Sequence, residues 1–66
     1  MPDEIEPILQ FFAYDHLPEH LLAVSRPFGS LAEALVAELP RNPERTVALR
    51  FLLQSKDAAV RARLYK

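Results

Sequence analysis

The sequence of 66 residues lacks the features that stabilise many small proteins. It contains no cysteine, which excludes disulfide bridges and thiolate metal sites. It has a single glycine, which excludes a glycine-rich phosphate-binding loop. In a chain this short, apolar burial roughly cancels the conformational entropy that is lost on folding. We therefore expect stabilisation by oligomerisation, because 50% of the residues are hydrophobic, enough to cover a second face.

Two further absences each exclude a class of protein. The net charge is −1, so the basic surplus of a duplex DNA-binding protein is missing. No apolar run approaches the roughly 18 residues of a membrane span. Acidic Asp3, Glu4 and Glu6 stand where a signal peptide would be basic. We expect a soluble cytoplasmic protein that binds neither a membrane nor duplex DNA.

The clearest structural signal is a proline-rich turn in the second half of the chain. Pro40 cannot continue a helix, and it disfavours helical geometry in the residue before it. Asn42 is a favourable N-cap, and Pro43 then stands at the first helical position, where its missing N–H costs nothing. The sequence therefore predicts an antiparallel helical hairpin with helices over residues 18–39 and 43–64.

The first predicted helix has one apolar stripe and one interruption. The stripe, with steps of three or four residues, comprises Leu21, Val24, Phe28, Leu31, Leu35 and Leu39, and Ala32 widens it. Pro27 removes a backbone hydrogen bond and predicts a kink, while Ser30 offers a point at which a second helix could begin. Because the stripe keeps its phase across this region, we favour a single helix that is kinked at Pro27.

The residues before the hairpin divide into two parts. Residues 1–6 are acidic, and we expect a flexible arm there. Residues 7–14 predict a short helix or docking segment that begins at Pro7. This segment is too apolar to remain in water, so it must pack on the hairpin or on a neighbour. Residues 1–66 are thus interpreted as one all-α domain.

The second predicted helix is apolar on two sides. One side carries Leu49, Leu52, Leu53 and Val60. The opposite side carries Val47, Phe51 and Ala58. Lys56 falls in the centre of the first side, so it must pair, extend to solvent or face a wet cavity. A helix with two apolar sides needs partners on both, which predicts a homo-oligomer.

One pattern suggests enzymatic chemistry and is rejected. The metalloprotease pattern H-x-x-E-H is matched by His16, Glu19 and His20. It requires both histidines on one face of a helix, but Pro18 starts the helix and leaves His16 outside it. No serine or threonine has a histidine placed by the sequence to activate it. We expect a protein that is not an enzyme and that holds no cofactor or metal.

The remaining candidate chemistry is aromatic and cationic. Tyr14 and Phe12 offer flat rings on which a nucleobase can stack. Cations that can meet phosphate are Arg26, Arg45, Lys56 and Arg61. Arg26 lies above Gly29 on the predicted helix, where we expect open space. The alternative is an ordinary surface charge, either solvated or paired with Glu33.

Short segments across most of the chain carry a resemblance to a known family. They are residues 12–14 (FAY), 17–18 (LP), 23–28 (AVSRPF), 31–32 (LA), 39–40 (LP), 44–50 (ERTVALR) and 56–62 (KDAAVRA). With them the chain resembles the small helical-hairpin proteins of tailed phages that are called anti-CBASS sponges. The resemblance implies a short N-terminal helix and two longer antiparallel helices, one of them kinked, assembled as a homohexamer.

The resemblance also implies a function. Such proteins bind cyclic dinucleotides between subunits, and some bind cyclic trinucleotides in separate pockets. They do not cleave these second messengers, and so withhold them from the CBASS effectors in the cytoplasm of the infected host cell. By resemblance, Tyr14 would stack on a base and Arg26 would meet phosphate, in a pocket shared across a subunit boundary. Lys56 and Arg61 join the candidate site because their own positions need an explanation.

Two other functions remain open at the level of sequence. The first is a structural or adaptor oligomer without a small-molecule ligand, for which helices with two apolar sides are sufficient. The second is a helix-turn-helix nucleic-acid binder, which the net charge of −1 and the proline-containing connection disfavour.

Overall fold

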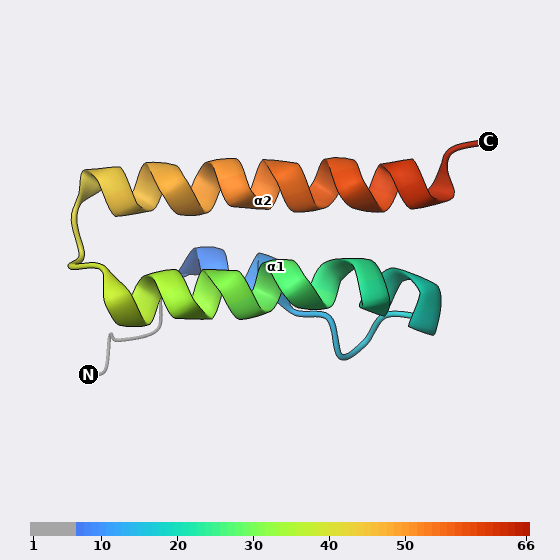
Figure 1. Cartoon of the computed structure of the whole chain (residues 1–66), viewed down its shortest axis with the longest axis horizontal. Coiled ribbons are helices and arrows are strands. Elements are labelled where there is room, and N and C mark those ends of the chain that lie inside the picture. The colour runs from blue at the N-terminus through green and yellow to red at the C-terminus, as the bar shows by residue number, and fades with distance from the viewer. Residues whose placement is uncertain (1–6) are drawn as a thin grey trace.

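A computed structural model describes residues 7–66, which form three helices and no strand (Figure 1). The 3₁₀ helix η1 spans Pro7–Phe12, and the α-helices α1 and α2 span Glu19–Glu38 and Pro43–Leu64. The two α-helices lie antiparallel, and η1 packs against both of them. The all-α hairpin is confirmed, with the bounds of α1 one residue inside those predicted. The predicted arm over residues 1–6 lies outside the described residues, and the homo-oligomer stays a prediction.

The turn between the helices is closed by its own side chains. Asn42 is the N-cap of α2, and its Oδ1 accepts a hydrogen bond of 2.8 Å from the Arg45 backbone N–H. The buried Arg45 guanidinium donates through Nη1 to the carbonyls of Val36 and Leu39, at 3.2 and 3.0 Å. These carbonyls belong to the end of α1, which has few other donors available. Arg45 therefore closes the hairpin and is not a candidate phosphate contact, which corrects the sequence-based suggestion.

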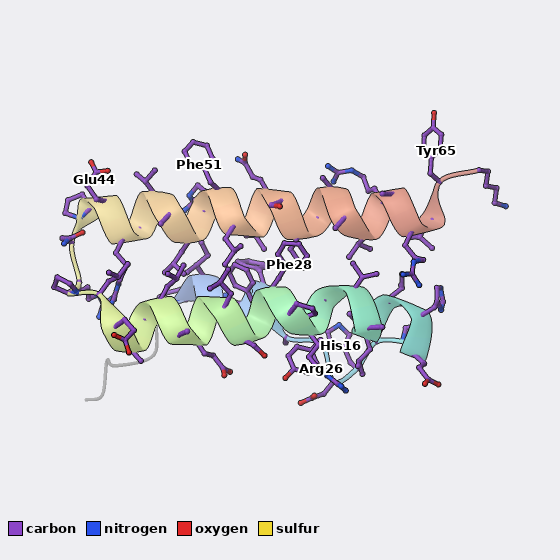
Figure 2. All side chains as sticks on the ribbon, viewed as in Figure 1. His16, Arg26, Phe28, Glu44, Phe51 and Tyr65 are labelled. Carbon is purple, nitrogen blue, oxygen red and sulfur yellow. The ribbon has the colours of Figure 1, made fainter. Side chains whose placement is uncertain are left out.

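The core lies where all three helices meet. One residue from each helix is buried there: Phe12, Ala32 and Leu49. The Phe12 ring is therefore not available to stack on a base, which corrects the sequence-based suggestion. Seven partly buried side chains pack around them: Ile8, Leu9, Phe28, Leu35, Val36, Leu52 and Leu53. Figure 2 shows Phe28 between the two long helices. The segment before the hairpin thus docks on the hairpin of its own chain, one of the two outcomes that its composition predicted.

Helix α1 continues through Pro27 without a break, so the expectation of a single helix is confirmed, whereas the kink at Pro27 stays a prediction. Its buried face differs from the predicted stripe. Leu31 and Leu39 are exposed, whereas the small residues Ser25, Gly29 and Ala32 are buried. Small side chains allow neighbouring segments to approach the helix closely, and this close approach buries them whatever their hydrophobicity.

Helix α2 has one covered and one bare apolar side. Leu49 is fully buried, with 0% of its surface exposed, whereas Phe51 is 64% exposed and Val47 is 44% exposed. Figure 2 shows the Phe51 ring pointing away from α1. Within residues 7–66, neither long helix is apolar enough over its length to cross a bilayer.

Candidate functional site

The loop from η1 to α1 places Tyr14 against the first turns of α1. The Leu17 N–H donates to the Tyr14 carbonyl at 3.0 Å, which folds the loop into a turn. The half-buried Tyr14 ring lies directly on Gly29, in the space that a side chain at that position would fill. Sequence reasoning expected open space there. The structure corrects this, because the ring of Tyr14 occupies it.

Tyr14 and Arg26 are brought together, although twelve positions separate them in the sequence. The Arg26 Cζ atom lies over the Tyr14 ring, 5.8 Å from its centroid. This is a cation–π contact, worth about 0.5–1 kcal/mol at an exposed site. Arg26 is exposed and lies on the side of α1 that faces away from α2 (Figure 2). Its guanidinium therefore keeps N–H donors for an anion beside an aromatic ring.

Lys56 and Arg61 lie at a different place, where both line a groove of about 410 Å³ between α2 and the loop. From the N-terminal part the groove is lined by Gln10, Phe11, Ala13, His16 and Leu17, and from the long helices by Ser25, Lys56, Asp57, Val60 and Arg61. Arg61 and His16 are exposed at this groove. The Ser25 hydroxyl is buried, with 1% of the residue exposed, and has no hydrogen-bond partner among the described residues. A buried polar atom without a partner is unfavourable, and Ser25 lies beneath the surface of the groove.

Lys56 has a structural role in addition to its place in this groove. Its Nζ donates to the Phe11 carbonyl at 2.8 Å and lies 3.2 Å from a carboxylate oxygen of Asp57. The first contact ties the end of η1 to α2, across 45 positions of sequence. Lys56 thus both pairs and faces a cavity, as its position predicted. Because Asp57 offsets part of its charge, Arg61 is the more available cation of the two.

A second, smaller groove of about 260 Å³ lies beside Tyr14. Its walls are Leu9, Phe12, Ala13, Tyr14, Asp15, Gly29 and Glu33. The carboxylates of Asp15 and Glu33 make this side unfavourable for phosphate, so an anionic group next to Tyr14 is directed towards Arg26. Ala13 lines both grooves, and the loop therefore separates the Tyr14–Arg26 pair from the Lys56–Arg61 pair.

The histidines of the rejected metalloprotease pattern lie in different elements. His16 stands in the loop, whereas Glu19 and His20 belong to the first turn of α1. In residues 7–66, no three His, Asp or Glu side chains gather closely enough to hold a metal ion.

Sequence reasoning missed three residues of the candidate site: His16, Ser25 and Gly29. The signal that could have found two of them is the spacing of small residues. Ser25, Gly29 and Ala32 recur at steps of four and three, which marks one line along α1 that other segments can approach closely. His16 has no such signal, because its place in the groove depends on the path of the loop.

Comparisons of this chain with protein families, with curated proteins and with solved structures find no match.

Proposed function

We propose that this protein binds cyclic di- or trinucleotides and sequesters them without cleavage, as a homo-oligomer in the cytoplasm of a phage-infected cell. The observation that carries the proposal is the contact between Tyr14 and Arg26. A stacking ring and an exposed guanidinium at one place are the two elements that a nucleotide needs, one for its base and one for its phosphate. The resemblance of residues 12–62 to anti-CBASS sponges gives the ligand class.

The groove at Lys56 and Arg61 supports the same proposal. A cyclic oligonucleotide carries at least two phosphates, and this groove supplies cations on the other side of the loop from Arg26. Each protomer thus has two places that can meet phosphate, the Tyr14–Arg26 pair and the Lys56–Arg61 pair. Two such places suit a ligand that is held between protomers. A cyclic ligand is also closed before it binds, so it loses little conformational entropy on capture.

Sequestration without cleavage is the outcome that the family resemblance implies, and the groove offers no accessible serine hydroxyl for attack on a phosphate. Ser25 is the hydroxyl residue of the groove, and its oxygen is buried in the protomer. A buried hydroxyl cannot take the in-line position that attack on a phosphate requires. The bound nucleotide should therefore be recovered intact after the protein is denatured, as measured by chromatography of the released ligand. Recovery of linear or hydrolysed nucleotide would contradict sequestration and favour an enzyme.

Calorimetric titration with cyclic dinucleotides tests the proposed site. We expect Tyr14→Ala and Arg26→Ala each to weaken binding by about tenfold or more, since a stacked base contributes ~1–3 kcal/mol. Matched controls are Tyr65→Ala and Arg50→Ala, which remove an exposed ring and an exposed guanidinium elsewhere on the protomer. Both controls should bind as the unmodified protein does. The proposal is wrong if the unmodified protein binds no cyclic di- or trinucleotide.

A structural or adaptor oligomer is the second candidate, and the bare side of α2 favours it. Phe51 and Val47 form an exposed apolar ridge that would be covered in any assembly, with or without a ligand. Native mass spectrometry with and without cyclic dinucleotide separates the two functions. An assembly that gains the mass of bound nucleotide supports the sponge, whereas an assembly that never gains it supports the adaptor. A helix-turn-helix function is favoured by no observation, and salt-dependent DNA binding would be its signature.

A further inference from the structure

The one glycine of the sequence lies under the ring of Tyr14. A Cβ atom built on Gly29 would lie 2.8 Å from Cε2 and 3.0 Å from Cδ2 of that ring, and 3.1 Å from the Phe12 carbonyl oxygen. Carbon atoms in favourable contact are about 3.5–4.0 Å apart. Any side chain at position 29 therefore collides with the present position of the Tyr14 ring.

The backbone itself does not need a glycine at this position. Gly29 lies inside α1, and no residue of the described part of the chain has a positive φ angle. Glycine in a helix interior destabilises it by roughly 0.5–1 kcal/mol relative to alanine. Helix formation alone would therefore favour alanine at position 29. What requires glycine is the space that the Tyr14 ring occupies.

The ring, rather than the rest of the segment, would have to move. Phe12 is 4% exposed and belongs to the core, and the Lys56 ammonium group holds the Phe11 carbonyl at 2.8 Å. The end of η1 is thus fixed at two points. The Tyr14 ring is half-buried at the edge of the smaller groove and can be displaced outward.

We propose that Gly29 is a positioning residue for the nucleotide stack. By leaving the surface of α1 bare, it seats the Tyr14 ring on the helix one turn away from Arg26. The ring and the guanidinium are then held at a fixed separation before a ligand arrives, so the stacked base and its phosphate meet both groups at once. This inference rests on the proposed function, since it assigns Gly29 a role at that same site.

Gly29→Ala tests the inference because it should weaken binding without a matching loss of stability. We expect cyclic dinucleotide affinity to fall about tenfold, the loss of one stacked contact. The melting temperature should change little, because the gain in helix stability from alanine is offset by crowding of the new Cβ against the Phe12 carbonyl oxygen, 3.1 Å away. The matched control is Ser30→Ala, which changes the next, exposed residue of α1 and should leave affinity unchanged. A variant that binds as tightly as the unmodified protein would overturn the inference.

A double-mutant cycle separates positioning from a general effect on the fold. In a Tyr14→Ala background there is no ring to displace, so Gly29→Ala should cause no further loss of affinity. A loss of equal size in both backgrounds would show that Gly29 acts independently of the ring, and would also overturn the inference.

An NMR measurement without nucleotide makes the two proposals separately testable. The Tyr14 ring should shift the side-chain proton resonances of Arg26 upfield, and Gly29→Ala should reduce this shift, whereas Ser30→Ala should not. A protein that shows the shift but binds no cyclic nucleotide would refute the proposed function and leave Gly29 as the seat of the ring. A protein that binds nucleotide but keeps the same shift in Gly29→Ala would refute the positioning role alone.

Discussion

The two sides of α2 differ in how many of their side chains are buried or bonded within a single protomer. On the side that faces α1, Leu49 is fully buried, Arg45 bonds the end of α1, and Lys56 bonds η1. On the opposite side, Phe51 and Val47 are exposed, and the described residues of the protomer do not cover them. Both sides have apolar side chains of similar size, so composition alone does not distinguish them.

This difference gives the two sides of α2 different expected roles. The inner side is sufficient to form the hairpin, because its apolar and its polar groups both find partners within one chain. The outer side contributes nothing visible to that hairpin, yet an exposed phenylalanine next to an exposed valine is unfavourable in water. The fold of one protomer thus depends on the inner side, and the predicted assembly depends on the outer side. Substitutions on the two sides should therefore change different measured quantities.

The largest effect on folding is expected from Leu49→Ala on the inner side. Removing a fully buried leucine leaves a cavity, and such changes cost about 2–5 kcal/mol. Urea unfolding followed by circular dichroism, at a protein concentration low enough to separate the protomers, measures this cost. Val47→Ala is the matched control on the outer side, where the same measurement should show a far smaller change. Similar losses for both variants would contradict the distinction between the two sides.

A smaller loss is expected from Arg45→Met, which keeps the apolar stem but removes the donors. The carbonyls of Val36 and Leu39 would then lose the Arg45 Nη1 donor at the end of α1, at a cost of about 1–3 kcal/mol. Arg50→Met, on an exposed part of the same helix, should change the unfolding free energy little. Equal stability of the two variants would show that the hairpin does not depend on the Arg45 contacts.

The N-cap of α2 is expected to contribute less again. Asn42→Ala removes the acceptor of the Arg45 N–H and should destabilise the protein by about 0.5–2 kcal/mol. Asn42→Asp keeps an acceptor in the same place and should retain most of the stability. Thermal unfolding of the three proteins measures both effects, and an alanine variant as stable as the aspartate variant would rule out a capping role.

The elements that local chemistry determines could be predicted from the sequence. Asn42 and Pro43 specify the start of α2 through capping and a fixed φ angle, and the structure begins α2 at Pro43. Lys56 was expected to pair, extend to solvent or face a wet cavity because it falls on the inner side of α2, and it has two partners and lines a groove.

The features that depend on the approach of distant segments could not be predicted in the same way. Hydrophobicity placed Leu31 and Leu39 on the buried stripe of α1, but both are exposed, and Val36, which the stripe left out, packs against the core. The sequence suggested that Arg45 was an available cation, because it does not show that the carbonyls at the end of α1 lie within reach of the guanidinium. The path of the loop decides which groove His16 joins. The family resemblance placed Tyr14 and Arg26 in one pocket across a subunit boundary, whereas the structure brings the two side chains together within one protomer.

The smallest effect on the folding of a single protomer is expected from Phe51→Glu on the outer side. Substitutions at exposed positions usually change stability by less than about 0.5 kcal/mol. The same change would place a charge in the interface of an assembled protein and should yield smaller species in analytical ultracentrifugation. Phe51→Leu, which keeps an apolar side chain, is the control and should remain assembled.

Because association stabilises the folded state by mass action, the melting temperature of the unmodified protein should exceed that of Phe51→Glu at high concentration and approach it on dilution. An unmodified protein that sediments as a stable monomer at micromolar concentration would show that the outer side of α2 is not an interface between copies of this chain.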